Sequence, residues 1–172
     1  AMSKYILFVR SSTNPGPRVR RVMEYLGSYS QYSIAYMSPI RASECPETDL
    51  ERWGGLRGEK YFGGSDAIGF MFFLVRFNFF VLKEVFSKRR LLYAVHFSDL
   101  ESVLFGGILC KLFGIKIIYN IHDNFFQRYA FGAFLGGFLR RLEEGYVYGS
   151  DVCFVPAAYR AEAYRPKLRH KF

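Results

Sequence analysis

Residues 91–121 read LLYAVHFSDLESVLFGGILCKLFGIKIIYNI and predict a strand, a helix and a second strand in succession. Residues 91–97 are an apolar, β-prone run. Ser98 and Glu101 have the spacing of a capping box, which begins a helix, and Gly114 fits the position just after a helix end. Residues 115–121 form a continuous apolar run, typical of a strand that is covered on both faces of a parallel sheet. The stretch therefore predicts a β–α–β unit.

The same alternation extends on both sides of this unit. Apolar runs at residues 5–9 and 32–37 predict two earlier strands, and the helical spacing of apolar residues between 19 and 26 predicts a helix between them. A helical pattern over 135–146 precedes a further strand at 152–155. Residues 38–66 predict an irregular connection with one short strand near 59–62. We expect one Rossmann-like α/β domain over residues 1–172, with a parallel sheet and helices on both faces.

The amino-acid composition excludes several classes of protein and favours one kind of partner. Apolar residues make up 51% of the chain, which excludes a disordered protein. Lys and Arg number 24 against 15 Asp and Glu, and the net charge of +9 favours an anionic partner. The three cysteines are widely spaced, which excludes a disulfide framework and a zinc ribbon. We expect a cytoplasmic setting, because the apolar run at 5–9 stops at Arg10 and is too short for a secretory signal.

Polar side chains follow two of the predicted strands. His96 and Asp99 come at the end of one, and His122, Asp123 and Asn124 follow the next. Ligands of open parallel sheets bind in the crevice at the carboxyl ends of the strands. There, the carboxylate of Asp123 beside the His122 imidazole can act as a general base toward a hydroxyl.

Structural roles remain open for the same residues. Asp123 can cap the next helix while His122 bonds to backbone, and Asp99 can favour the positive end of the helix that it precedes. His96, His122 and Asp123 lack the spacing of a metal site, so we expect no metal.

The loop after the first strand offers a second candidate site. It contains one glycine, Gly16, and lacks the glycine patterns of dinucleotide-binding and P-loop proteins. The helix that follows still presents free N–H groups to a phosphate, with Arg18 and Arg20 nearby. A solvated basic helix face is the alternative.

Residues 67–86, AIGFMFFLVRFNFFVLKEVF, are long enough to cross a bilayer. Arg76 at the centre of the run argues against a transmembrane helix, because a charge at mid-membrane is unfavourable. Either the segment is a core helix, or its phenylalanines enter a membrane interface while basic residues bind lipid headgroups. The residues of the predicted membrane contact are Phe72, Phe73, Phe77, Phe80, Lys83, Lys88, Arg89 and Arg90.

The order of these motifs resembles the N-terminal domain of GT-B glycosyltransferases, especially the large retaining family four. The resemblance is carried by ILFVRSSTNPGPRVRRVMEYL, AVHFSD, KIIYNIHDNF and RRLEEGYVYGSDVCFVP, and it covers nearly the whole chain. It implies a Rossmann-like half of a two-domain enzyme. This half binds the acceptor, and a C-terminal domain binds the nucleotide-sugar, which is a substrate and requires no cofactor.

The resemblance also implies roles for individual residues. Asp123 and His122 would be catalytic, and His96, Asp99 and Asn124 would bind the acceptor. Asn14, Gly16, Arg18 and Arg20 would form the donor-phosphate loop, which here has Pro-Gly-Pro where the family has a Gly-Gly pair.

The family's donor domain is absent from this sequence. We therefore expect the acceptor-binding half of a transferase, inactive alone and in need of a donor domain or a separate donor-binding subunit. Its expected partners are a glycolipid or glycan acceptor and an anionic membrane surface at the inner face of the cell membrane. We expect no nucleic-acid partner, because no recognition motif accompanies the charge. A non-enzymatic module that binds anionic membranes is the alternative.

Overall fold

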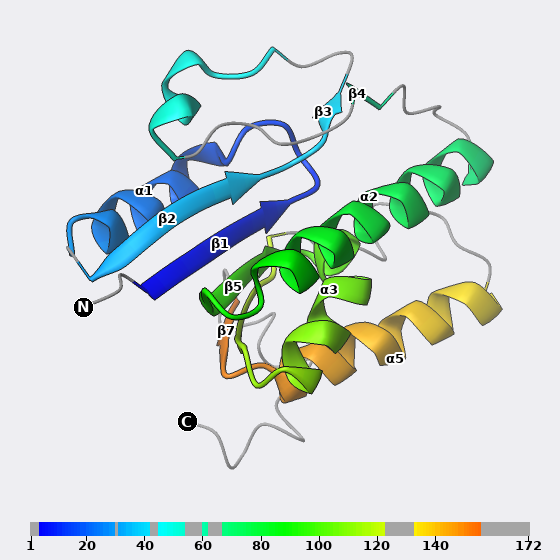
Figure 1. Cartoon of the computed structure of the whole chain (residues 1–172). Coiled ribbons are helices and arrows are strands. Elements are labelled where there is room, and N and C mark those ends of the chain that lie inside the picture. Colours follow the sequence, from blue (N-terminus) through cyan, green and yellow to red (C-terminus); the bar gives the residue numbers. More distant parts are fainter. Residues whose placement is uncertain are drawn as a thin grey trace.

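A parallel five-stranded sheet forms the centre of the molecule (Figure 1). The computed structural model describes residues 4–29, 31–41, 45–53, 60–61, 67–122 and 133–155. The strand order is β2-β1-β5-β6-β7, and all neighbouring pairs are parallel. The strands are β1 (Lys4–Arg10), β2 (Tyr32–Met37), β5 (Leu92–Ser98), β6 (Lys116–Asn120) and β7 (Val152–Phe154). The predicted α/β class with a parallel sheet is confirmed.

Helices cover both faces of the sheet, as the sequence predicts. On one face α1 (Gly16–Gly27) and the 3-10 helix η1 (Thr48–Trp53) enclose a core that includes Phe8, Met23 and Tyr36. On the other face lie α2 (Ala67–Lys88), α3 (Leu100–Leu112) and α5 (Ala133–Gly149). Apolar side chains therefore alternate between two cores along each strand, which explains the uninterrupted apolar runs in the sequence.

The connection between β2 and α2 holds a second, smaller sheet. Strand β3 (Ile40–Arg41) pairs in parallel with β4 (Lys60–Tyr61). The short strand expected near residues 59–62 is therefore present. No helix in the described ranges is both long and apolar enough to span a membrane.

A buried amide joins α2 to α3. The Nδ2 atom of Asn78 donates to the carbonyl oxygens of Leu74 at 3.0 Å and Glu101 at 2.7 Å. Its Oδ1 atom accepts the backbone N–H of Phe105 at 3.3 Å. Gly106 allows a close approach, since a Cβ atom there would lie 2.7 Å from the side chain of Val81. These contacts explain how a helix with a polar residue at its centre packs into an apolar layer.

Candidate functional site

The strands β1, β5 and β6 end side by side at what we call the carboxyl edge of the sheet. Asp99 follows β5 and His122 follows β6. The Oδ1 atom of Asp99 accepts the backbone N–H of His122 at 2.7 Å, and its own backbone N–H donates to the carbonyl of Asn120 at 2.9 Å. The side chain of Asn120 lies 3.0 Å from Nε2 of His122. Asp99, from one predicted group of rim residues, is therefore hydrogen-bonded to His122, from the other.

Asp99 holds an unusual backbone conformation. Its φ of 66° and ψ of 164° lie in a region that is essentially restricted to glycine. Among the described non-glycine residues, it alone has a positive φ. Asp99 also takes the N-cap position of α3, but its carboxylate binds His122 rather than the helix end. The predicted capping box at Ser98 is wrong, because β5 extends through Ser98.

Beneath this edge lies a group of buried polar atoms that have no hydrogen-bond partner among the described residues. His96 is 1% exposed and stacks on Phe8 with ring centroids 4.7 Å apart. Its two ring nitrogens, Oγ of Ser98 and Oδ1 of Asn120 have no hydrogen-bond partner within the described parts of the chain. Ser98 and Asn120 are register partners, and strand alternation places both on the α1 side of the sheet with His96.

Such atoms are rare, because a buried donor or acceptor left unpaired costs about 1–3 kcal/mol. His96, Ser98 and Asn120 therefore require hydrogen bonds from water or from a bound polar group.

The buried group is electrically neutral at neutral pH. Burial, followed by the nearby charge of His122, lowers the pKa of His96 from 6.5 to about 4. A neutral imidazole has one donor and one acceptor nitrogen. His96, Ser98 and Asn120 thus present both donors and acceptors, which suits a hydroxylated ligand better than an anion.

The loop after β1 is held by Arg10, and sequence reasoning missed this role. Nη1 of Arg10 donates to the carbonyl oxygens of Asn14, at 3.1 Å, and of Pro15. Gly16, with a φ of +70°, lies against the same guanidinium. The amide of Asn14 binds the 45–47 segment, donating to Cys45 and accepting the N–H of Glu47. Asn14 thus anchors a neighbouring segment, whereas the sequence predicts a phosphate contact.

The two arginines of α1 differ in their surroundings. Arg20 forms ion pairs with Glu47 and with Asp49, the latter at 2.8 Å. These carboxylates compete for the charge that the sequence assigns to a phosphate, and the role of Arg20 at a phosphate stays a prediction. Arg18 is exposed. No sequence signal nearby indicated the acidic partners, which lie more than 25 residues further along the chain.

The roles of several predicted site residues stay predictions. Asp123 and Asn124 lie outside the described residues, so their roles stay predictions. His122 is half-buried at the edge. In the described ranges, no three His, Cys, Asp or Glu side chains come together as a metal site.

The predicted membrane contacts divide between the two sides of α2. Phe73 and Phe77 are buried in the core, so this part of the prediction is wrong. Phe80 is half-buried, and Lys88 turns inward to bind Glu84 and the hydroxyl of Tyr5. Phe72, Lys83 and Arg90 are exposed. Phe79 belongs to the phenylalanine face that the sequence offers to a membrane, and it is exposed. Helical spacing groups Val75 and Phe86 with Phe72 and Phe79, and the sequence reading missed these two residues and Met71.

Comparison with solved structures supports the fold. UGT2 of Phytolacca americana, complexed with UDP-2fluoro-glucose and pterostilbene, matches 72% of this chain at 12% identity and a TM-score of 0.50. The chain has a Rossmann-like fold similar to part of UGT2. Acinetobacter baumannii MurG matches 90% of this chain at 14% identity and a TM-score of 0.46.

Both of these structures are of GT-B glycosyltransferases, and this chain spans less than half of either. It covers 31% of the UGT2 chain and 44% of the MurG chain. No protein-family model and no curated protein matches the sequence.

Proposed function

We propose that this chain is the acceptor-binding half of a glycosyltransferase. The complete enzyme would move a sugar from a nucleotide-sugar to a hydroxyl of a lipid- or polysaccharide-linked acceptor at the inner face of the cell membrane. The observation that carries the proposal is the neutral group of His96, Ser98 and Asn120 at the carboxyl edge. Ligands of open α/β sheets bind at this edge, and the likeness to UGT2 supports the same reading.

The chemistry follows from the neighbouring residues. The acceptor oxygen would form a bond to the anomeric carbon of the sugar as the bond from that carbon to the nucleotide phosphate breaks. Asp123 would take the proton of the acceptor hydroxyl, and His122 would orient the acceptor. His122 is fixed for this task through the Asp99 carboxylate, which holds its backbone N–H. The departing nucleoside diphosphate would be bound by a donor domain or a separate subunit.

Removing the Asp123 carboxylate tests this proposal. In the complete enzyme, Asp123→Asn should lower turnover by about 100-fold or more, because general-base catalysis typically contributes that much. Turnover is measured as nucleoside diphosphate released from a panel of UDP- and GDP-sugars in the presence of a membrane lipid extract. The thermal unfolding midpoint should not change.

Asp151→Asn is the matched control. Asp151 binds a backbone N–H at the opposite edge of the sheet, so its removal should leave turnover near the wild-type value. Near-normal turnover of Asp123→Asn would contradict the assignment.

A further inference from the structure

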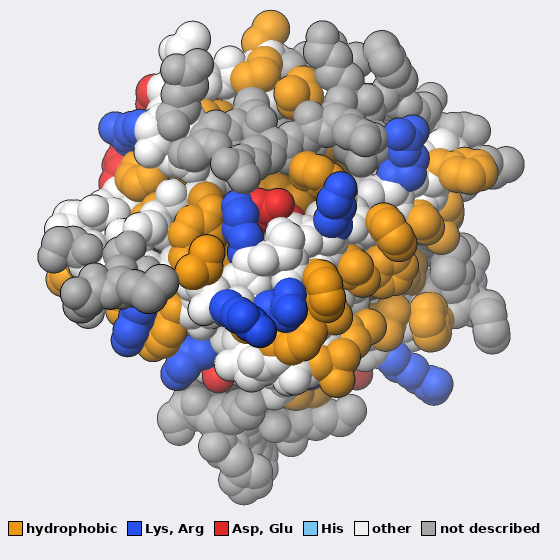
Figure 2. All heavy atoms as spheres, viewed as in Figure 1, with side chains coloured by type: hydrophobic (Ala, Val, Ile, Leu, Met, Phe, Trp, Pro, Cys, Tyr) orange, Lys and Arg blue, Asp and Glu red, His pale blue; other side chains and the backbone are white. Residues whose placement is uncertain are grey.

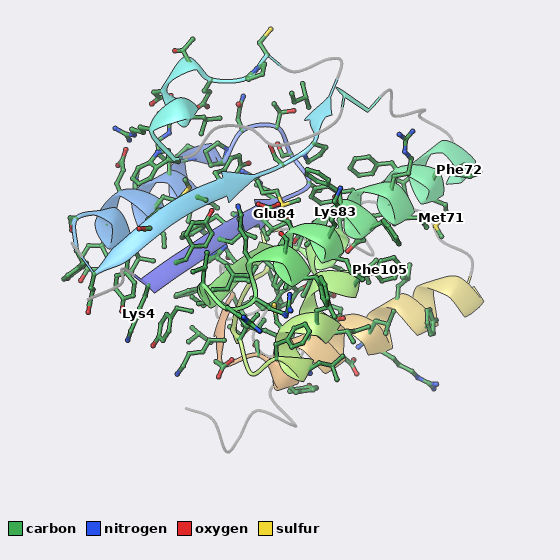
Figure 3. All side chains as sticks on the ribbon, in the orientation of Figure 1. Lys4, Met71, Phe72, Lys83, Glu84 and Phe105 are labelled. Carbon is green, nitrogen blue, oxygen red and sulfur yellow. The ribbon has the colours of Figure 1, made fainter. Side chains whose placement is uncertain are left out.

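Helix α2 has two apolar sides, and only one of them is covered by described residues. The inner side packs on the sheet through Phe73, Phe77 and Val81. The outer side carries aromatic and aliphatic residues whose exposed fractions range from 41% to 67%: Met71, Phe72, Val75, Phe79 and Phe86. Figure 3 shows Met71 and Phe72 near one end of α2 and Lys83 further along the same helix. An exposed group of large apolar side chains on one helix side marks a surface that binds a protein or a membrane.

The apolar surface continues onto α3. The rings of Phe86 and Phe113 lie 6.0 Å apart, and this contact joins the end of α2 to the end of α3. Ile108 and Leu112 extend the surface and are exposed. In Figure 2, hydrophobic side chains gather where Figure 1 places α2 and α3, with Lys and Arg side chains beside them. We call Met71, Phe72, Val75, Phe79, Phe86, Ile108, Leu112 and Phe113 the α2–α3 face.

Positive charge accompanies this face. The guanidinium of Arg89 lies 4.4 Å from the ring centre of Phe86 and 5.8 Å from that of Phe113. Exposed cations on α2 and in the turn that follows it include Arg76, Lys83 and Arg90. The acidic residue Glu84 is paired with Lys88. Exposed aromatic rings among basic residues are the surface that enters the interface of an anionic bilayer.

We propose that the α2–α3 face docks on an anionic lipid bilayer, with α2 lying along the membrane surface. Because β2 and β5 are parallel, α2 runs from the carboxyl edge back to the opposite edge (Figure 1). Docking along its length holds the carboxyl edge beside the lipid headgroups, where a lipid-linked acceptor would be presented. The inference rests on the proposed function for the acceptor, but the docking surface needs no transfer chemistry.

A second copy of the chain fits this surface less well. Two copies facing each other would bring the cations of both α2 helices together, and like charges across an interface oppose association. An anionic bilayer instead meets the same cations with opposite charge. The charge of the face therefore favours lipid over self-association.

Vesicle sedimentation tests the proposal directly. The whole chain should bind vesicles of phosphatidylcholine and phosphatidylglycerol (7:3) at least 10-fold more tightly than pure phosphatidylcholine vesicles at 0.1 M NaCl. Phe72→Ser/Phe79→Ser should weaken this binding at least 10-fold, because both rings are exposed and would lose their burial in lipid. Both positions lie outside the core, so circular dichroism should show unchanged folding.

A matched double variant on α1, on the opposite face of the sheet, provides the control. Tyr25 and Tyr29 are exposed on and just after α1, across the sheet from α2. Tyr25→Ser/Tyr29→Ser should bind vesicles like the wild type. Equal loss in both double variants, or no preference for anionic vesicles, would overturn the proposal. So would a wild-type dimer in sedimentation velocity that Phe72→Ser/Phe79→Ser converts to monomer without affecting vesicle binding.

Tryptophan fluorescence reports which surface enters the lipid. Trp53 is the single tryptophan of the chain and lies beside α1, so Trp53→Phe gives a dark background. In that background Phe79→Trp should shift its emission to the blue on anionic vesicles and be quenched by brominated lipids, whereas Tyr25→Trp should show neither effect. The reverse pattern would contradict the assigned face. Because Asp123→Asn should bind vesicles normally, failure of docking and failure of transfer are separable outcomes.

Discussion

The two edges of the sheet each contain a residue with positive φ and an aspartate that binds backbone. At the amino edge, Gly114 has a φ of +65° and the Oδ2 atom of Asp151 accepts the N–H of Ile117 at 2.8 Å. At the carboxyl edge, Asp99 serves both purposes, with a φ of 66° and a bond of 2.7 Å to the N–H of His122. Glycine tolerates this conformation, whereas aspartate is strained in it.

The two edges also differ in how well their polar groups are hydrogen-bonded. At the amino edge, Ile115 and Asp151 line a hollow of about 390 Å³. The backbone N–H of Ile115 donates to the carbonyl of Cys110 at 2.8 Å, and that of Asp151 donates to the carbonyl of Ile117 at 2.9 Å. At the carboxyl edge, atoms of His96, Ser98 and Asn120 have no partners within the described ranges. Strain and unpaired polar atoms together distinguish the carboxyl edge, which is where the proposed function places the acceptor.

The largest expected effect concerns His96. Its pKa is near 4 in the folded protein and 6.5 when unfolded, so the unfolded chain binds a proton that the folded protein excludes. The free energy of unfolding should therefore fall as the pH drops from 6.5 to 4, by up to roughly 3 kcal/mol from this residue. Urea unfolding of the wild type and of His96→Leu between pH 7 and pH 4.5 measures the difference.

His96→Leu also tests the unpaired nitrogens. An apolar side chain of similar size removes two unsatisfied buried atoms, so the variant should be as stable as the wild type or more so at pH 7. Its stability should depend less on pH over the same window. If the free energy of unfolding depends on pH equally in the two proteins, protonation of His96 is not what destabilises the wild type at low pH.

The sequence predicts the sheet and the position of the rim. Uninterrupted apolar runs such as residues 115–121 arise because both faces of each strand are covered, and the helices between them have clear periodicity. The convergence of His96, Asp99 and His122 follows from parallel topology alone, because side chains after parallel strands meet at one edge. Gly114 was predicted as a helix end, and the bond from the N–H of Ile115 to the carbonyl of Cys110 confirms it.

Features that depend on tertiary contacts were not accessible from sequence. Helix α2 has large apolar residues on nearly every side, so its composition does not indicate which phenylalanines face the core, and Phe73 and Phe77 are assigned to the wrong side. The pairing of Arg20 with Glu47 and Asp49 joins distant segments. The strained backbone of Asp99 has no sequence signature, since glycine is the residue expected there.

Substitutions of Asp99 separate strain from hydrogen bonding and have the next largest effect. Asp99→Ala keeps the unfavourable backbone and loses the bond to His122, so it should cost about 2 kcal/mol of unfolding free energy. Asp99→Gly loses the same bond but relieves the strain, so it should be more stable than Asp99→Ala by about 1–2 kcal/mol. Both should reduce turnover of the complete enzyme, because His122 is no longer held. Equal stability of the two variants would contradict backbone strain at this position.

Substitution of Gly114 should have the smallest effect on stability, and it tests whether glycine keeps the backbone of the amino edge free of strain. A Cβ atom on Gly114 would meet nothing within 4 Å, so Gly114→Ala changes only the backbone preference and should destabilise the protein by about 1 kcal/mol. Gly137 within α5 also has open space around a Cβ but has no positive φ. Gly137→Ala should therefore stabilise the protein by up to about 1 kcal/mol through helix propensity. If thermal unfolding shows the same sign for both substitutions, backbone conformation does not distinguish these glycines, and the contrast between a relaxed amino edge and a strained carboxyl edge loses its basis.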